Sequence, residues 1–337
     1  MRVLLCVLAI AAGAGAARFP AAPTPVATAS RATRAEPLLT TGSRTSPPRA
    51  AAVLARAVAP TPAPHSPVGR PFADGLVVTG GTSHRLILFT FDDGPERHLT
   101  PILLDELDRA RVKAVFFLTG ARIAERGGLE RDQAAVAQEI ARRGHIVANH
   151  TMDHIALPSL EDREVVRQMQ DEELIFERLF GERPWLLRPP GAAHTQRIDR
   201  IIASRGYTTL LWNLGTGDVF VRTPEEVLET WKRVAERRER ENGERGGIIL
   251  LHDIHPWSVA AFPLIHAELM RRNCELYDRG EELYDIVDDP RFFFVPREDA
   301  EPGTLAPPAL PDPVELAERQ TRLREETRVR CRTLASR

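Results

Sequence analysis

Residues 86–91 read LILFTF, a short continuous apolar run of the kind found in strands that are buried on both faces. Loop residues follow this run, and an amphipathic stretch then extends over 101–111. The same alternation of apolar and amphipathic segments continues to about residue 280. It predicts further strands at 114–118, 145–149, 185–187, 208–212, 247–251 and 275–277. Helical patterns separate them near 130–143, 161–180, 195–205, 224–238 and 257–272.

Strands that alternate with helices form βαβ units, in which the strands of one sheet run parallel. The sequence therefore predicts an α/β fold. With about seven parallel strands, a distorted (β/α) barrel is the expected architecture, and a doubly wound open sheet is the alternative.

The regions before and after this alternation differ in composition. A basic residue, a short apolar run and small residues predict a secretory signal peptide over 1–17, and so a secreted, periplasmic or cell-envelope protein. Residues 18–80 are rich in Ala, Pro and Thr and predict a disordered linker, because they bury too little apolar surface to offset the entropy of ordering. The expected catalytic domain covers 81–295, and a Pro-rich and charged tail with a helical pattern near its end covers 296–337.

Charge and cysteine content exclude several classes of protein. The 45 basic and 47 acidic residues give a net charge of −2, without the basic field that a nucleic-acid-binding protein needs. No stretch after the signal peptide is long and apolar enough to span a membrane. Cys6, Cys274 and Cys331 lack the paired spacings of zinc fingers. If Cys6 leaves with the signal peptide, the other two either form one bridge or remain free.

Polar side chains directly follow several predicted strands. They are Asp92, Asp93, His150, His154, Arg188 and His252. The carboxyl ends of parallel strands face one crevice, so we expect these groups to meet at one rim of the fold. Taken singly, each of these residues has an ordinary structural explanation; the Asp pair, for example, is common in turns. Together, two imidazoles and a carboxylate make a three-ligand metal site with room for water and substrate. His150 and His154 can face one ion if their segment turns helically.

The same stretches resemble the motifs of the polysaccharide deacetylase family, also called carbohydrate esterase family 4 or the NodB homology domain. The resemblance covers about residues 84–285. TFDDGP at 90–95 is similar to the first motif, HTMDH at 150–154 to the second, RPP at 188–190 to the start of the third, and LLH at 250–252 to the fifth.

The resemblance implies that Asp93, His150 and His154 bind a divalent metal. Zn²⁺ is the expected ion, with Co²⁺, Mn²⁺, Fe²⁺ and Ni²⁺ as alternatives. A bound metal lowers the pKa of a water ligand from about 15.7 to about 7, which provides a nucleophile for amide hydrolysis at neutral pH.

The resemblance also implies the remaining roles. Asp92 is the general base, held in its ionised form by Arg188. His252 is the general acid that protonates the departing amine. Leu250 lines the pocket for the acetyl methyl group. In addition, the backbone N–H of Gly191 is a suitable donor to the oxyanion of the tetrahedral intermediate.

Two motifs depart from the usual pattern. The third normally continues with an aromatic residue and Gly, whereas Gly191 and Ala192 stand here. The fourth commonly reads Asp, two residues, then Asp-Trp, and this chain has Gly215 and Val219 in place of the first Asp and the Trp. Asp218 remains as a candidate partner for His252. These changes leave the class of sugar open.

The expected function is metal-dependent removal of acetyl groups from the N-acetylated sugars of a polysaccharide: peptidoglycan, a chitin-like polymer or poly-N-acetylglucosamine. A hydrolase of another amide or of an acetyl ester is a close alternative. A non-catalytic carbohydrate-binding protein on a deacetylase fold is a second. Two imidazoles and one carboxylate also suit non-haem iron oxygenases, although the βα alternation and the second carboxylate disfavour that class.

Overall fold

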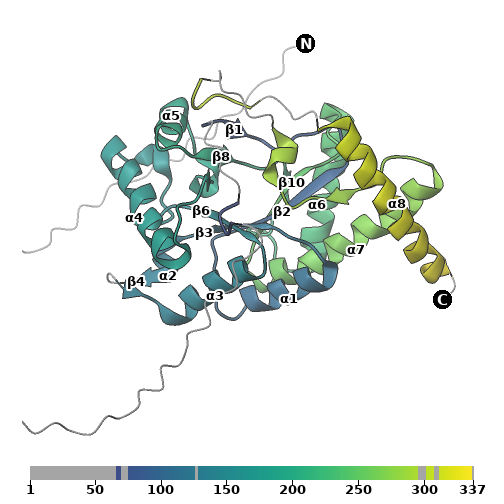
Figure 1. The fold of residues 1–337 in the computed structure, drawn as a ribbon, viewed down its shortest axis with the longest axis horizontal. Helices are drawn as coiled ribbons and strands as arrows, with labels where there is room; N and C mark the ends of the chain where they lie inside the picture. The colour runs from purple at the N-terminus through teal and green to yellow at the C-terminus, as the bar shows by residue number, and fades with distance from the viewer. Residues whose placement is uncertain (1–65, 70–74, 126–127, 295–300, 307–310, 336–337) are drawn as a thin grey trace, which may run out of the picture. The chain divides into compact units, whose positions relative to one another are not determined.

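The structure is a computed structural model that describes residues 66–69, 75–125, 128–294, 301–306 and 311–335 (Figure 1). The predicted signal peptide and most of the predicted linker lie outside these residues. Val77 and Val78, which we assigned to the linker, form the strand β1 (Val77–Val78) and pair with β8 (Thr208–Leu210). The linker prediction is wrong for these two residues, because both valines are buried against the edge of the sheet.

The centre of the described structure is a parallel sheet of nine strands. Its order is β1-β8-β7-β6-β3-β2-β10-β9, and β11 pairs with β2. The remaining strands are β2 (Leu86–Asp92), β3 (Val115–Leu118), β6 (Ile146–Asn149), β7 (Leu186–Leu187), β9 (Leu214–Gly215), β10 (Gly247–His252) and β11 (Asp285–Ile286). These strands confirm the parallel α/β class and six of the predicted strands.

The predicted strand at 275–277 is wrong, because these residues belong to the helix α7 (Pro256–Asp278). Leu269, Asn273 and Leu276 are buried on one face of α7 at helical spacing. A segment of three residues is too short for its hydrophobic pattern to separate a strand from a helix face.

The sheet curls into an open, distorted barrel. β8 and β9 lie towards opposite ends of the sheet, yet only residues 211–213 join them. So short a link spans at most roughly 14 Å, so the ends of the sheet must approach each other. Asn213 attaches this link to β10, since its side chain accepts a hydrogen bond from the Ile248 N–H at 2.9 Å and donates one to the Gly246 carbonyl at 3.1 Å. The barrel architecture was therefore predicted correctly.

Both faces of the central strand β2 are buried. Ile87, Phe89 and Phe91 belong to the hydrophobic cluster that β2 shares with the covering helices, whereas Leu86 and Leu88 belong to a second cluster made mainly by other strands. Because successive strand side chains point to opposite faces, the first set packs under the helices and the second fills the barrel. This explains the uninterrupted apolar run at 86–91.

Helices cover the outside of the sheet (Figure 1). The long ones are α1 (Thr100–Ala110), α3 (Arg131–Arg142), α4 (Asp162–Phe180), α5 (Gln196–Ser204), α6 (Pro224–Asn242) and α7. Shorter elements are α2 (Gly120–Ile123), the hairpin of β4 (Ala124–Glu125) and β5 (Gly128–Leu129), and the 3-10 turns η1 (Leu157–Ser159), η2 (Pro190–Ala192) and η3 (Pro290–Phe293). In the described part of the chain, none of the helices has the length and apolar character needed to span a membrane.

The end of the predicted tail folds back as the helix α8 (Pro313–Ala335), which lies beside α7 and β11 (Figure 1). Cys331 of α8 forms a disulfide with Cys274 of α7, which decides between the two states that the sequence left open. Arg319 pairs with Asp285 of β11 at 2.7 Å. The tail is therefore attached to the barrel by covalent and ionic contacts.

Candidate metal centre and active site

The predicted site residues meet at the carboxyl ends of neighbouring strands. β2 ends at Asp92 and β10 at His252, and the pairing register sets these two residues side by side. β6 ends directly before His150 and is separated from β2 only by β3. The convergence of strand-end side chains at one rim is thus present in the fold.

Asp93, His150 and His154 form a compact cluster, in which one ligand atom from each residue lies within 4.8 Å of the others. Oδ1 of Asp93 lies 3.3 Å from Nε2 of His150 and 3.0 Å from Nε2 of His154. Two ligands of one tetrahedral Zn²⁺ lie roughly 3.3 Å apart, given metal–ligand bonds of about 2.0 Å. Oδ1 of Asp93 is also buried without a hydrogen bond, and a cation would satisfy this acceptor. The donor set fits a divalent metal.

The backbone carbonyl of Arg188 fixes the orientation of the His150 ring. Its Nδ1 lies 2.8 Å from the backbone carbonyl of Arg188, so Nδ1 carries the proton and Nε2 presents its lone pair towards Asp93. A carbonyl partner of this kind fixes the tautomer of metal-binding histidines.

The backbone at the cluster is unusual. Asp93, Thr151 and His154 have φ angles of 72°, 72° and 53°, in the left-handed region that disfavours residues other than glycine. Such conformations persist where the surrounding structure enforces them, and they concentrate at functional sites. Residues 150–154 form a loop. The two imidazoles therefore converge without the helical turn on which the sequence argument depended.

Asp92 and Arg188 form a buried ion pair. Nη1 of Arg188 donates to Oδ1 of Asp92 at 2.6 Å, and both side chains are almost completely buried. Nε and Nη2 donate to the carbonyls of Leu210 and Leu211 at 2.7 and 3.0 Å, and Nη1 also donates to Thr90 Oγ1 at 2.9 Å. The guanidinium carbon lies 4.0 Å from the ring centroid of Phe117. Burial lowers the pKa of Arg188, and the adjacent carboxylate opposes that shift. Arg188 stays charged, so the carboxyl group of Asp92 faces a buried cation.

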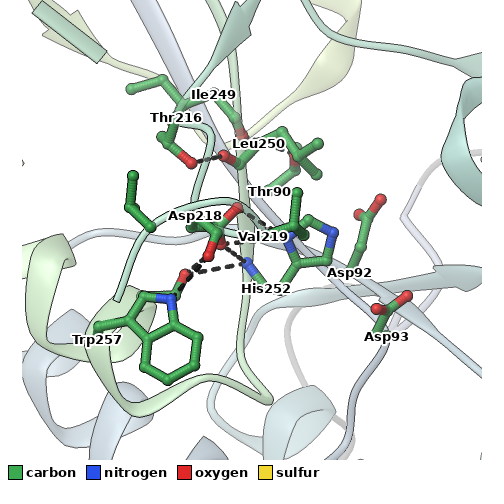
Figure 2. A network of polar contacts seen from close by, with 12 residues as sticks. Thr90, Asp92, Asp93, Thr216, Asp218, Val219, Ile249, Leu250, His252 and Trp257 are labelled. Atoms are coloured by element: carbon green, nitrogen blue, oxygen red, sulfur yellow. Dashed lines mark hydrogen bonds and ion pairs between the residues drawn. The ribbon is translucent and has the colours of Figure 1, made fainter. Parts of the chain in front are cut away.

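His252, which is partly buried, and the buried Asp218 form a second pair, shown in Figure 2. Nδ1 of His252 lies 3.0 Å from Oδ1 of Asp218, and the backbone N–H of His252 donates to Oδ2 at 2.8 Å. Burial alone would lower the pKa of His252, but Asp218, with smaller contributions from Asp92 and Asp93, raises it to about 9. His252 is consequently an imidazolium near neutral pH.

Two residues without an assignment from the sequence hold Asp218. Ser258 Oγ donates to its carboxylate at 2.6 Å. Trp257 Nε1 donates to its backbone carbonyl at 2.7 Å (Figure 2). Both come from the first turn of α7. Their only sequence signal is their place just after the LLH motif, and that place does not reveal a contact with a residue about forty positions earlier.

Leu250 and Gly191 border the same rim. Leu250 lies two residues before His252 on β10, so the two side chains leave the strand on the same face. Gly191 lies in η2 with φ of 60°, and a β-carbon there would meet no atom within 4 Å. Residues 191 and 192 are Gly and Ala, so neither position supplies an aromatic side chain next to the RPP motif.

Other polar residues near the motifs have local partners. His194 pairs with Asp199 at 2.9 Å, and the ring of His255 stacks on Trp257 with centroids 4.8 Å apart. Asp253 is fully buried and accepts a hydrogen bond from Thr100.

Comparison with known proteins places these features in context. Residues 79–210 match the model of a family described as polysaccharide deacetylase. The chain is 30% identical over 204 residues to a peptidoglycan-N-acetylglucosamine deacetylase of Bacillus cereus, which covers 60% of this chain and 89% of that protein. A peptidoglycan-N-acetylglucosamine deacetylase of Listeria monocytogenes is 32% identical over 204 residues, which are 60% of this chain and 39% of that protein. Among solved structures, the chitin deacetylase of Colletotrichum lindemuthianum is 27% identical, with a TM-score of 0.51. The match covers 64% of this chain and 94% of that one.

Proposed function

Because this chain belongs to the polysaccharide deacetylase family, and so to the hydrolases of carbon–nitrogen bonds other than peptide bonds, we propose that it removes acetyl groups from N-acetylglucosamine residues of a polysaccharide. The two peptidoglycan deacetylases above favour peptidoglycan as the substrate. A chitin-like polymer offers the same acetamide and is the alternative substrate to test.

We propose that Asp93, His150 and His154 hold one divalent cation. The orphaned Oδ1 of Asp93 and the two imidazole nitrogens beside it support this assignment. When bound, such an ion lowers the pKa of a water molecule and polarises the acetamide carbonyl. Mixed nitrogen and oxygen ligands favour Zn²⁺, and Co²⁺, Mn²⁺, Fe²⁺ and Ni²⁺ accept similar ligands.

Asp92 acts as the general base in this proposal. Arg188 occupies its Oδ1, so Oδ2 is the oxygen left to accept a proton, and it lies 3.7 Å from His150 Nε2, on the side of the metal cluster. As water attacks the carbonyl carbon, the proton passes to Asp92. Because Arg188 fixes the carboxylate, little reorganisation is needed during the transfer.

His252 acts as the general acid. Its raised pKa keeps the imidazole protonated at neutral pH, and Asp218 occupies Nδ1, so the proton on Nε2 is the one available for transfer. Donation to the amine nitrogen allows the carbon–nitrogen bond to break, whereas without it the tetrahedral intermediate would return to reactants. We assign Leu250 to the acetyl pocket and the N–H of Gly191 to the oxyanion.

The observation that best supports the proposal is that a proposed base and a proposed acid lie beside the same metal cluster, each with a partner of opposite charge. The buried Asp92 is paired with the Arg188 cation, and the partly buried His252 has a pKa raised to about 9 by Asp218. A protein that only binds carbohydrate has no physical need to keep both groups in these states.

We also infer that the protein works outside the cytoplasm. The Cys274–Cys331 disulfide supports this, because disulfides persist in oxidising compartments. The N-terminal stretch with signal-peptide character supports it as well. Sequencing the N-terminus of the exported protein tests the predicted cleavage after residue 17.

Acetate release by the purified protein tests the proposed reaction. Peptidoglycan, chitin oligomers and an O-acetylated polymer are offered in parallel, with Asp92→Asn as the inactive variant and Asp108→Asn, at an exposed ion pair, as the matched control. We expect acetate and new free amines from an N-acetylated polymer, loss of activity with a chelator, and recovery with Zn²⁺. Polymer binding that survives both chelation and Asp92→Asn, with no acetate from any wild-type reaction, would instead identify a binding protein.

A further inference from the structure

The loop between the two proposed histidine ligands rests on α4, and we propose that Gln168 of α4 fixes this loop and thereby sets how tightly the site binds its cation. The loop comprises residues 151–153. Gln168 is a positioning residue in this inference, since it acts through the loop. The inference rests on the proposed metal site formed by Asp93, His150 and His154.

Gln168 is completely buried and uses both ends of its side-chain amide on Asp153. Its Oε1 accepts from the backbone N–H of Asp153 at 2.8 Å, and its Nε2 donates to Oδ2 of Asp153 at 2.7 Å. Because a carboxylate only accepts hydrogen bonds, this pairing also fixes which way the amide faces. The backbone carbonyl of Gln168 accepts a third bond from the N–H of Met152 at 3.0 Å.

The opposite side of the loop rests on α2. The carbonyls of Thr151 and Met152 accept from the N–H groups of Gly120 and Ala121 at 3.2 and 2.7 Å. A β-carbon at Gly120 would lie 3.1 Å from the Cα of Met152, so the helix approaches the loop as closely as glycine permits. The loop is held between α2, which binds the carbonyls of Thr151 and Met152, and α4, which binds the N–H groups of Met152 and Asp153.

This support matters most for His154. His150 is buried, and the Arg188 carbonyl orients its ring. The side chain of His154 is 42% exposed, and within the described residues its ring contacts Asp93 through Nε2 without a comparable carbonyl partner. The direction of His154 therefore depends on its backbone, which has a left-handed φ directly after Asp153. Loss of the Gln168–Asp153 hydrogen bonds would therefore let the backbone of His154 move and change the direction of its imidazole.

Arg167 also reaches Asp153, but it is a weaker support. Its Nη2 lies 3.0 Å from Oδ2 of Asp153, and the half-exposed guanidinium is shared with Glu164 and Asp171. Exposed ion pairs of this kind contribute little to holding a loop. Arg167 contacts the same carboxylate as Gln168 from the solvent side, which makes Arg167→Gln a matched control.

The test is the Zn²⁺ affinity of the full-length protein, measured by competition with a chromophoric chelator. Gln168→Glu keeps the shape and the acceptor for the Asp153 N–H, but it replaces the donor to the Asp153 carboxylate with a second negative charge. We expect its Zn²⁺ dissociation constant to rise about 10- to 100-fold, as for other residues that orient metal ligands. The added negative charge by itself would strengthen cation binding, so weaker binding reports the loss of the hydrogen bond from Gln168 to the Asp153 carboxylate.

The double variant Gln168→Glu/Asp153→Asn supplies the rescue. It has the net charge of the wild type and restores the bond with its direction reversed, since the new amide at position 153 donates to the new carboxylate at position 168. We expect its Zn²⁺ affinity, and that of Arg167→Gln, to lie within about threefold of wild type, well below the loss expected for an orienting residue. If Gln168→Glu does not fold, judged by circular dichroism, Gln168→Met removes the same bonds without a charge and is expected to show the same loss.

The outcomes separate the inference from the proposed function. Wild-type protein that binds no Zn²⁺ at the Asp93 cluster would overturn the metal site itself. Wild-type protein that binds one Zn²⁺, with equal affinity in folded Gln168→Glu or Gln168→Met, would overturn only the role of Gln168. A double variant that folds but does not regain affinity would also overturn it.

Discussion

Replacement of Asp218 by Asn tests whether the ion pair with His252 keeps the general acid charged. Burial lowers the pKa of His252, and Asp218 is the largest of the influences that raise it, to a net value of about 9. Without that carboxylate, the pKa of His252 is expected to fall to its ordinary value of 6.5 or below. Asn keeps the size of Asp218 but only one of its two acceptor oxygens, so a loss common to all pH values reports the missing hydrogen bonds, and the pH-dependent part of the loss reports the missing charge.

The magnitude follows from these two values. At pH 8, a group with a pKa of 9 is about 90% protonated and one with a pKa of 6.5 about 3%, so activity should fall roughly 30-fold. At pH 6 both forms are mostly protonated, and the loss from protonation should be less than about twofold. A cation bound at Asp93 lowers both pKa values together, which moves this window to lower pH, but the loss at the higher pH remains the larger one.

The assay is kcat/KM for acetate release from a soluble N-acetylglucosamine oligomer between pH 6 and 9. The basic limb of the wild-type profile should move to lower pH in Asp218→Asn and stay in place in Asp108→Asn, the exposed control. A loss that is the same at pH 6 and pH 8 would refute the reasoning, because it would show that Asp218 does not act through the charge of His252.

Three further predictions concern stability. Arg188→Met leaves the Asp92 carboxylate buried and unpaired, and we expect urea denaturation to show a loss of about 3 to 5 kcal/mol; a double variant with Asp92→Asn that is no more stable than Arg188→Met would argue against this cause. Cys274→Ser/Cys331→Ser opens a bridge between residues 57 positions apart, and should cost up to about 4 kcal/mol in thermal unfolding while acetate release at 25 °C is retained; an unchanged unfolding temperature would contradict the structural role of the bridge. Burial raises the pKa of Asp253 to about 7, above its ordinary value of 3.8, so the folded state binds its proton more tightly and loses stability as pH rises from about 4 to 7. Asp253→Asn removes this loss and should raise the unfolding temperature more at pH 8 than at pH 5, and an equal rise at both would be evidence against it.

Much of the site could be predicted from sequence because its residues follow strands that are easy to recognise. The run ending at Phe91 has the continuous apolar character of a strand buried on both faces, and the next residues are Asp92 and Asp93. Once the strands are parallel, their carboxyl ends share one edge, so the approach of His150 and His252 to the two carboxylates follows from topology.

The parts that were missed depend on contacts that a local pattern does not encode. β1, β9 and β11 have two residues each, too few to show a period, and their conformation comes from pairing with longer neighbours. Trp257 and Ser258 reach Asp218 only because the first turn of α7 lies against the loop after β9. Likewise, the loop at 151–153 takes its shape from α2 and α4, so the left-handed conformations of Thr151 and of His154, which follows the loop, could not be predicted from the local sequence.

The central claim is that one divalent cation is shared by a carboxylate and two imidazoles. An anomalous diffraction map of crystals soaked in Zn²⁺, collected above and below the zinc absorption edge, tests it most directly. The account predicts a single strong peak about 2.0 to 2.2 Å from Asp93 Oδ1 and from Nε2 of both His150 and His154. A peak elsewhere, or none between these three atoms in zinc-saturated crystals, would contradict it.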